Sequence, residues 1–212
     1  MAKKLLYITA NPKQEGESFS LQAGKVFLEA YKEKNPQNEV NELDLFQTRI
    51  PQLNALLFGA FGKLQEGIDF SDLSSKEQEV LSEMNQLLEQ FMQADEYVVV
   101  NPLWNFSIPP VLKAYLDVVV QAGKTFRYTE NGPIGLLESK KALHIQASGG
   151  VYSEGPAKEM EFGHRYLKSI LGFIGIQDLE FIPVEGTSMG DDQAKEILYK
   201  AQNRAVEIAR EF

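Results

Sequence analysis

The sequence lacks cysteine, has only two histidines and one tryptophan, and contains no long apolar run. The absence of cysteine excludes a disulfide framework, a thiolate metal site and a cysteine nucleophile. Its longest apolar runs, such as Val98–Val100 and Val118–Val120, are far shorter than the ~18 residues that a membrane span needs. Basic residues are also in deficit. The 21 Lys and Arg face 30 Asp and Glu, and the net charge of −9 argues against binding to nucleic acid or anionic lipid.

The composition is that of a soluble globular domain. Hydrophobic residues make up 43% and charged residues 24% of the 212, and a single α/β domain of this length is ordinary. No linker, repeat or low-complexity tract divides the chain, so residues 1–212 are predicted to form one domain. A strand-like pattern begins within Met1–Tyr7 and leaves no room for a signal peptide, so we expect a cytoplasmic protein.

Strand and helix patterns alternate along the whole chain. Apolar or alternating runs predict strands at Lys4–Thr9, Glu39–Leu45, Tyr97–Val100, Ala142–Ala147 and Leu179–Val184. Amphipathic spacing predicts helices at Ser20–Lys34, Ser75–Ala94, Val111–Gln121, Glu159–Ile174 and Asp192–Ala209. Parallel strands joined by helical crossovers predict an α/β, doubly wound three-layer sandwich with a five-stranded parallel sheet.

Two connections are longer than this fold requires. They are Arg49–Leu73, after the second strand, and Gly123–Ser139, after the third crossover helix. Connections of this length are usually functional, and we expect each to carry a short helix or a hairpin.

Ligands of such sheets bind beyond the carboxyl ends of the strands, where the winding direction changes. The first loop at this edge leads into a helix, and its Ser18 and Ser20 could hold an anion together with backbone amides. The alternative is that one serine simply caps the helix. Neither a Walker A loop nor a Gly-x-Gly-x-x-Gly motif is present. The loop therefore suits the monophosphate of a mononucleotide better than a nucleoside triphosphate.

A second loop, Asn101–Pro110, contains the only tryptophan. Prolines at both ends restrict its backbone, and Asn105 provides polar groups beside Trp104 and Phe106. A rigid loop with an amide between aromatic rings suits a flat, hydrogen-bonding heterocycle, although the same rings could merely cover the end of the core.

A third loop begins at Ser148, Gly149 and Gly150, where the fourth strand ends. Paired glycines allow close approach of the backbone to a ligand and present N–H groups to it, but they also form ordinary turns. The remaining signals for chemistry are weak. His144 lies in a predicted strand and His164 in a predicted helix, and we interpret both as structural. No metal site and no Gly-x-Ser-x-Gly nucleophile are indicated. This pattern favours a cofactor that carries the reaction itself.

These loops closely resemble those of the FMN-dependent NADH-azoreductases, flavodoxin-like quinone reductases of bacteria, and the resemblance covers essentially the whole chain. It is carried by Ser18-Phe19-Ser20, Pro102–Phe106, Pro109–Ala114, Gly123–Glu130 with Gly132-Pro133, Gly149-Gly150 and Glu154–Pro156. It implies a flavodoxin-like fold, bound FMN as cofactor and NADH as electron donor. Quinones and aromatic azo compounds are the acceptors that it implies.

The resemblance also implies roles for individual residues. The FMN phosphate would be held by Ser18, Phe19 and Ser20. The isoalloxazine would be contacted by Pro102, Leu103, Trp104, Asn105 and Phe106 on one side and by Ser148, Gly149 and Gly150 at its pyrimidine edge. Where the family often has Arg-Gly-Gly, this chain has Ser148-Gly149-Gly150, which should leave FMN binding intact but could alter the preference for substrate or nicotinamide.

Two other functions fit the sequence less well. The acidic charge of −9 suits a flavodoxin-like electron carrier that docks on a basic redox partner without oxidising NADH itself. The other is a mononucleotide-binding module without redox chemistry. The extra length, the two inserted segments and the whole-chain resemblance favour the enzyme.

The family forms homodimers in which aromatic side chains of one subunit approach the flavin of the other. By that resemblance, Phe126 and Tyr128 in the second inserted segment, and Phe173 near the end of a predicted helix, are expected to bind substrate across a subunit interface. The competing interpretation places the phenylalanines in the core of one subunit.

Overall fold

The computed structural model describes residues 2–212, and its main feature is one parallel sheet of five strands. The strands lie in the order β2-β1-β3-β6-β7, and every neighbouring pair is parallel. Their bounds are β1 Lys4–Thr9, β2 Glu39–Asp44, β3 Glu96–Pro102, β6 Lys141–Ser148 and β7 Asp178–Glu185. The chain winds outward to β2, then back across β1 to β3, so the winding direction changes between β1 and β3. A change of direction of this kind defines a doubly wound sheet, and the fold prediction is confirmed.

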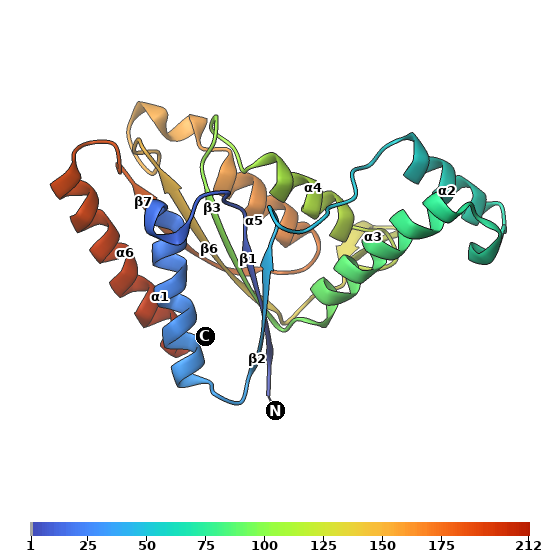
Figure 1. Ribbon diagram of the computed structural model, residues 1–212, viewed down its shortest axis with the longest axis horizontal. Coiled ribbons are helices and arrows are strands. Elements are labelled where there is room, and N and C mark those ends of the chain that lie inside the picture. The colour runs from blue at the N-terminus through green and yellow to red at the C-terminus, as the bar shows by residue number, and fades with distance from the viewer. Residues whose placement is uncertain (1) are drawn as a thin grey trace.

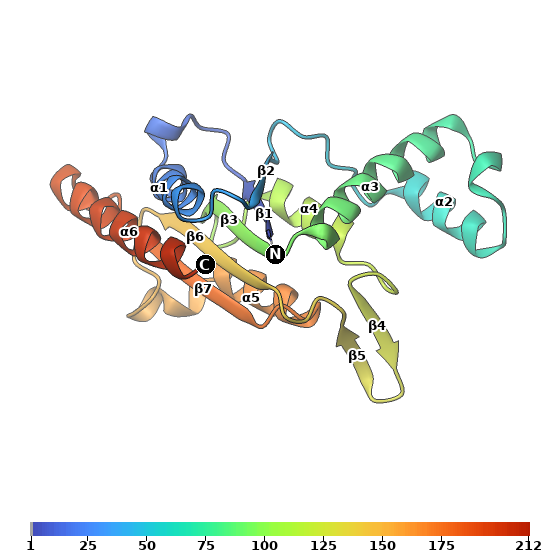
Figure 2. The same ribbon diagram turned by 90° about the horizontal axis from the view of Figure 1, so that it is seen from below.

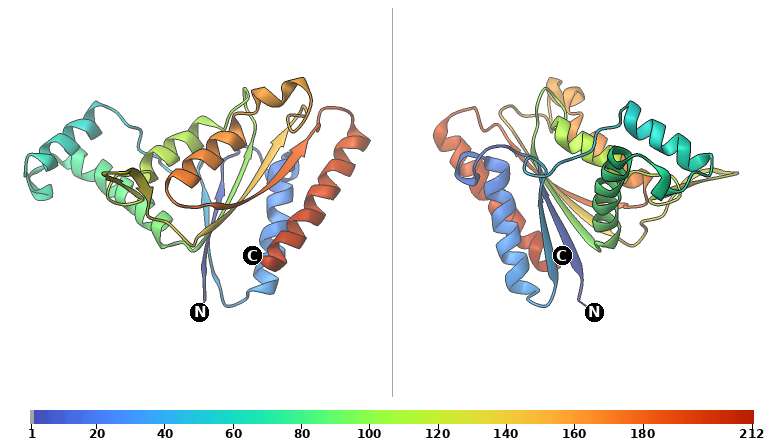
Figure 3. Two further views of the ribbon diagram at one scale, coloured as in Figure 1. Left: turned by 180° about the vertical axis from the view of Figure 1, so that it is seen from behind. Right: turned by 45° about the vertical axis from the view of Figure 1, so that its right-hand side comes forward.

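Helices cover both faces of the sheet (Figure 1). One face carries α1 (Phe19–Lys34) and α6 (Asp191–Glu211), and the other carries α3 (Ser75–Gln93), α4 (Pro110–Val119) and α5 (Gly163–Phe173). Figure 3 shows α1 and α6 lying side by side, with the other helices across the sheet.

Alternation along each strand builds the two halves of the core. Leu5 and Tyr7 of β1 pack toward α1 and α6, whereas Leu6 and Ile8 pack toward α3 and α4. Successive side chains of a strand point to opposite faces, so a strand buried on both faces has to be apolar throughout. That is why Lys4–Thr9 and Tyr97–Val100 read as continuous apolar runs.

The first inserted segment carries α2 (Ala55–Gln65) and a single 3₁₀ turn at Phe70–Asp72. The second carries a hairpin of β4 (Phe126–Thr129) and β5 (Gly132–Gly135), which extends away from the main sheet (Figure 2). Both expectations of a short helix or hairpin are confirmed.

The helix predicted from Glu159 is wrong at its start. Glu159 lies in a separate 3₁₀ turn, Pro156–Met160, and α5 begins only at Gly163. The carboxylate of Glu161 decides the start, because it accepts the backbone N–H groups of His164 and Arg165 at 2.7 and 3.2 Å. A carboxylate in this place satisfies amides that have no partner within the helix.

Candidate functional site

A cleft of about 230 Å³ opens at the carboxyl ends of β1, β3 and β6. It lies where the winding direction of the sheet changes, the usual ligand position in this architecture. Its lining comes from the three loops that the sequence singled out and from the loop after β7: Asn11, Lys13, Glu17, Ser18, Phe19, Ser20, Pro102, Leu103, Trp104, Ala147, Ser148, Gly149 and Thr187.

A cluster of polar side chains closes the cleft at the first turn of α1. The Nδ2 atom of Asn11 lies 2.7 Å from Ser18 Oγ and 3.5 Å from Ser20 Oγ, and the two hydroxyl oxygens are 3.1 Å apart. Ser18 is also the N-cap of α1, because its Oγ accepts the N–H of Leu21 at 3.3 Å. Capping and ligand binding are therefore compatible. With Oγ accepting two N–H groups, the hydroxyl proton of Ser18 is available for donation.

The loop after β6 is oriented by its neighbour after β7. The carbonyl oxygens of Ser148, Gly149 and Gly150 accept hydrogen bonds from the backbone N–H groups of residues 186–188, at 3.0 to 3.2 Å. The hydroxyl of Thr187 also donates to the Ser148 carbonyl, at 3.0 Å. Within residues 2–212, neither Gly149 nor Gly150 donates its N–H to another backbone carbonyl. This loop can therefore offer unused N–H groups to a ligand.

The aromatic loop after β3 is a strained two-residue hairpin. Trp104 and Ser107 exchange both backbone hydrogen bonds, at 2.8 and 2.9 Å, and the two residues between them have positive φ angles, 47° for Asn105 and 69° for Phe106. This is the type I′ pattern, in which the second position is normally glycine. A bulky residue there costs on the order of 1–3 kcal/mol. The strained backbone conformation persists only where contacts with surrounding residues stabilise it.

Aromatic rings surround this hairpin. Trp104 meets Phe46 edge to face at a ring-centroid distance of 6.1 Å, and Phe106 meets Tyr152 at 6.0 Å. Phe46, Trp104 and Phe106 are each more than a third exposed. The rim of the cleft therefore presents flat apolar surfaces on which a planar ligand can stack.

Eight of the eleven predicted cofactor residues line the cleft: Ser18, Phe19, Ser20, Pro102, Leu103, Trp104, Ser148 and Gly149. Asn105, Phe106 and Gly150 lie outside the lining, in the turns that continue from it. Five lining residues were not predicted: Asn11, Lys13, Glu17, Ala147 and Thr187. Asn11 follows β1 after Ala10, and Thr187 follows β7 after Gly186, so polar residues just beyond strand ends were the available signal.

The two histidines meet, although 20 residues separate them. Nδ1 of His144 lies 3.0 Å from Nδ1 of His164, and Nε2 of His144 lies 2.9 Å from the Oδ1 of Asn101. Burial lowers the pKa of His144 well below its usual value, and the neighbouring His164 lowers it further. Burial also lowers the pKa of His164. Among residues 2–212, no group of three His, Cys, Asp or Glu side chains could hold a metal ion.

Comparison with known proteins agrees with the fold. A family described as having a flavodoxin-like fold matches residues 3–209. The chain is 53% identical to FMN-dependent NADH:quinone oxidoreductase 3 of Halalkalibacterium halodurans and 52% identical to FMN-dependent NADH:quinone oxidoreductase of Geobacillus kaustophilus. Each match spans 209 residues and 99% of both chains. This chain belongs to the family of these FMN-dependent NADH:quinone oxidoreductases, which has the flavodoxin-like fold. The predicted family is confirmed.

Solved structures give the same result. An azoreductase from Bacillus anthracis superimposes with a TM-score of 0.91 at 37% identity, over 99% of this chain and all of the other. An FMN-dependent NADH-azoreductase from the same species, solved in complex with FMN, superimposes with a TM-score of 0.92 at 36% identity, over 98% and 97% of the two chains.

Within this family member, the predicted substrate residues lie far from the cleft of their own chain. Phe126 packs against Phe173 and Tyr128, with ring centroids 4.6 and 5.4 Å apart. These residues sit at the opposite end of the sheet, because Phe173 lines a cavity together with residues at the amino-terminal ends of the strands. Phe126 is 8% exposed and Tyr128 is 74% exposed. Within one subunit, therefore, these side chains do not line the cleft.

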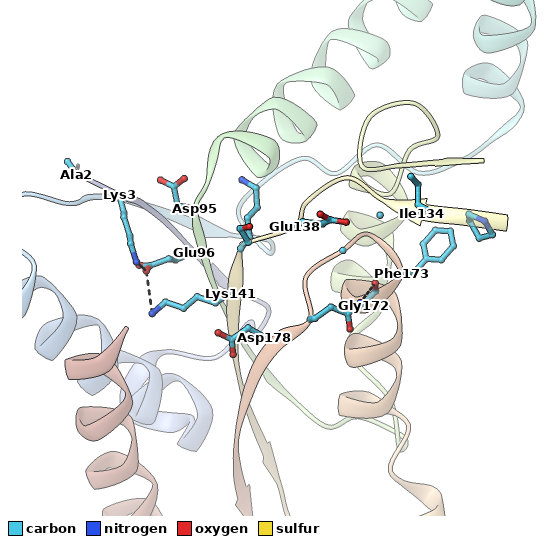
Figure 4. A pocket seen from close by; sticks show the side chains of 16 residues that line it. Ala2, Lys3, Asp95, Glu96, Ile134, Glu138, Lys141, Gly172, Phe173 and Asp178 are labelled. Atoms are coloured by element: carbon cyan, nitrogen blue, oxygen red, sulfur yellow. Dashed lines mark hydrogen bonds and ion pairs between the residues drawn. The ribbon is translucent and has the colours of Figure 1, made fainter. Parts of the chain in front are cut away.

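That opposite cavity is larger, about 1090 Å³, and two of its lysines pair with one buried carboxylate (Figure 4). Glu96 is buried and contacts Lys3 at 2.5 Å and Lys141 at 3.5 Å. The hydroxyl of Tyr31 donates to the same carboxylate at 2.7 Å. Because this cavity lies at the amino-terminal ends of the strands, away from the carboxyl ends where ligands of such sheets bind, we place the functional site in the smaller cleft.

No helix among the described residues is both long enough and apolar enough to cross a membrane.

Proposed function

We propose that this protein is an FMN-dependent NADH:quinone oxidoreductase that also cleaves aromatic azo compounds reductively. The observation that carries the proposal is the cleft at the winding switch, which combines a serine pair at a helix amino terminus with an aromatic rim. Relatives that match the whole chain at 52 to 53% identity are named for this activity. A structural neighbour contains FMN.

The donors in the cleft fit the two ends of FMN. Hydroxyls of Ser18 and Ser20 and the amides of the first turn of α1 suit a phosphate, since the helix terminus carries unpaired N–H groups and partial positive charge. Lys13 adds a cation to the lining. The planar ring would lie against Leu103 and Trp104, with the N–H groups of Gly149 and Gly150 available to its polar edge.

When bound, FMN supplies the redox chemistry itself, since flavins accept hydride from NADH and pass two electrons to an acceptor. The protein provides binding, orientation and electrostatics. Unused N–H groups of the Ser148–Gly150 loop would stabilise negative charge at the polar edge of the ring. No side chain of this chain is proposed as a nucleophile.

We further propose that donor and acceptor use the same site in turn, in a ping-pong order. The cleft has one aromatic rim, formed by Phe46, Trp104 and Phe106, on which both a nicotinamide and a quinone would stack. A quinone needs one such cycle, whereas cleavage of an azo bond to two amines needs two. An exposed apolar rim of this kind selects flat acceptors rather than one particular acceptor.

The working unit is proposed to be a homodimer. Exposed apolar side chains gather on α2 and beside it: Leu53, Leu56, Phe58, Leu64, Ile68 and Phe70. This segment projects from the body of the molecule together with the start of α3 (Figure 1). Exposed apolar side chains gathered on one projecting segment favour an interaction site there. In such a dimer the exposed Tyr128 is the side chain best placed to reach the partner's cleft. Phe126 packs against Tyr128, and Phe173 packs against Phe126.

The test of this function is quinone-dependent oxidation of NADH by the protein before and after loading with FMN. We expect loading to switch on turnover without any added protein. A flavodoxin-like carrier would bind FMN but oxidise NADH only after addition of a separate reductase. A mononucleotide-binding module without redox function would show no flavin-dependent turnover under either condition.

A further inference from the structure

The strained Trp104–Ser107 turn and the segment just before it are connected to the start of α5 in two places. Within the turn, the carbonyl oxygen of Phe106 accepts the backbone N–H of Phe162 at 2.9 Å. Two residues before the turn, the carbonyl of Pro102 accepts a hydrogen bond from Asn101 Nδ2 at 2.9 Å. Asn101 is in turn connected through His144 to His164, the second residue of α5. Residues 161–164 are therefore the common base of both attachments.

The hydrogen bonds from His164 to Pro102 all point the same way. Since the amide of Asn101 gives its N–H to Pro102, its Oδ1 faces His144, and Nε2 of His144 must carry the proton. Burial keeps His144 neutral by lowering its pKa, so its Nδ1 is an acceptor and Nδ1 of His164 must be the donor. Each bond in such a chain polarises the next and strengthens it.

Packing brings residues 161–164, where the chain of hydrogen bonds begins, directly against the loop after β3. A Cβ atom on Gly163 would lie 2.2 Å from Oε1 of Gln146 and 2.8 Å from Cδ1 of Leu103, so only glycine allows this approach. The amide of Gln146 donates to Glu161 at 2.9 Å and ties the start of α5 to β6. The Leu103 N–H donates to the carbonyl of Ala147 at 2.7 Å, which joins the loop to the end of the same strand.

We propose that Asn101 and His144 are positioning residues that, together with the Phe162 N–H, hold the Trp104–Ser107 turn in its strained, ligand-binding conformation. The proposal rests on the proposed function for its effect on FMN, but its effect on the turn does not. Without these anchors, the positive φ angles of Asn105 and Phe106 would relax, and Leu103 and Trp104 would leave their places in the cleft.

The experiment uses the only tryptophan, Trp104, which lies in the turn itself. Acrylamide quenching of its fluorescence is measured in FMN-free protein, and the Kd for FMN is then measured by titration. His144→Leu removes both bonds of the imidazole, whereas His144→Gln keeps an N–H that can reach Asn101. We expect the Leu variant to show stronger quenching and a roughly tenfold higher Kd, and the Gln variant to recover most of both.

Asn101→Asp gives a second test with almost no change in volume. It keeps an acceptor toward His144 but replaces the N–H donated to Pro102 with a second oxygen that repels this carbonyl, and it adds a buried carboxyl group. We expect it to raise quenching and Kd as His144→Leu does, so the proposal stays testable if the Leu variant does not fold. The control is Ile208→Ala, which opens a cavity on the other side of the sheet and should lower Tm while leaving quenching and Kd unchanged.

Strain relief separates positioning from general stability. In a Phe106→Gly background the turn adopts its conformation freely, so Asn101→Asp should raise quenching much less than it does with Phe106 present. Equal effects in the two backgrounds, or Asn101→Asp quenching equal to that of the Ile208→Ala control, would overturn the proposal. If the parent protein fails to bind FMN, the proposed function is wrong, and the quenching series still decides the role of the anchors.

Discussion

The hydroxyl oxygens of Ser18 and Ser20 lie 3.1 Å apart at the amino terminus of α1, and the side-chain amide of Asn11 lies within hydrogen-bond distance of both. All three side chains are buried and line the cleft. A pair of hydroxyls ordered in this way is a phosphate-binding arrangement that loses little entropy on binding.

Ser18→Ala combined with Ser20→Ala should weaken FMN binding far more than it destabilises the fold. Hydrogen bonds to a charged group are worth about 1.5–3 kcal/mol each, whereas loss of an N-cap costs about 1 kcal/mol. We expect the Kd for FMN, measured by fluorescence titration, to rise at least about a hundredfold. The matched control is Ser82→Ala with Ser169→Ala, two exposed helix serines that bond only to backbone carbonyls. Unchanged affinity in the cleft variant would remove the serines from the phosphate site.

Asn105 should affect the rate of FMN reduction more than it affects retention of FMN. Two substitutions separate its side chain from its backbone: Asn105→Gly keeps the positive φ of 47° without strain, while Asn105→Ala also strains the turn. If the amide orients the ring, both variants reduce bound FMN slowly with NADH in single-turnover measurements. A glycine variant as fast as the parent would show that only the backbone conformation matters.

The buried histidine pair should make stability depend on pH. Because burial lowers the pKa of His144 and of His164 in the folded protein, the unfolded chain binds protons more readily than the folded one. Stability is therefore greatest above about pH 6.5 and falls as the pH drops through that value, with a slope of at most about 1.4 kcal/mol per pH unit for each histidine. Glu161 opposes the shift at His164 and Lys168 adds to it.

Urea unfolding at about pH 7.5 and about pH 5.5 measures this effect. Carboxylates such as Glu77, whose pKa is lowered to about 2 by hydrogen bonds from Lys63 and Ser74, lose their contribution only at lower pH. The parent should lose stability between the two conditions, and His144→Gln should lose less. Identical losses in the two proteins would assign the pH dependence to other groups.

Most of the fold could be predicted because burial on both faces leaves a direct pattern in the sequence. Lys4–Thr9 is a strand with the predicted bounds, and the helix predicted at Ser75–Ala94 ends within one residue of α3. The start of α5 could not be predicted, because it depends on Glu161 folding back on its own helix and on the fit of Gly163 against Gln146.

The site could be predicted in part for a related reason. Loops that follow strands in a doubly wound sheet must meet, so Ser18, Trp104 and Gly149 were found together. Contacts between segments distant in sequence carry no comparable pattern. The bond between His144 and His164, and the positive φ of Phe106 at a position that normally takes glycine, became visible only with the backbone in place.

The proposed dimer predicts that a charge on α2 will separate the subunits. Phe58 is 62% exposed on that helix, and Phe58→Glu should halve the mass found by sedimentation, because a buried unpaired carboxylate opposes association. Quinone turnover should fall while bound FMN is retained. Tyr199→Glu is the control, since Tyr199 is equally exposed, at 64%, on α6 away from the patch. A parent protein that is monomeric and fully active would contradict the dimer.

Direct transfer of electrons from NADH through bound FMN to a quinone is the central claim, and sequential stopped-flow mixing tests it. FMN-loaded protein is first mixed without oxygen with one equivalent of NADH, and a quinone is added after the first phase ends. The account predicts that the flavin absorbance bleaches in the first phase without any partner protein and returns in the second. Persistent absorbance after NADH, with bleaching only when a separate reductase is supplied, would contradict it.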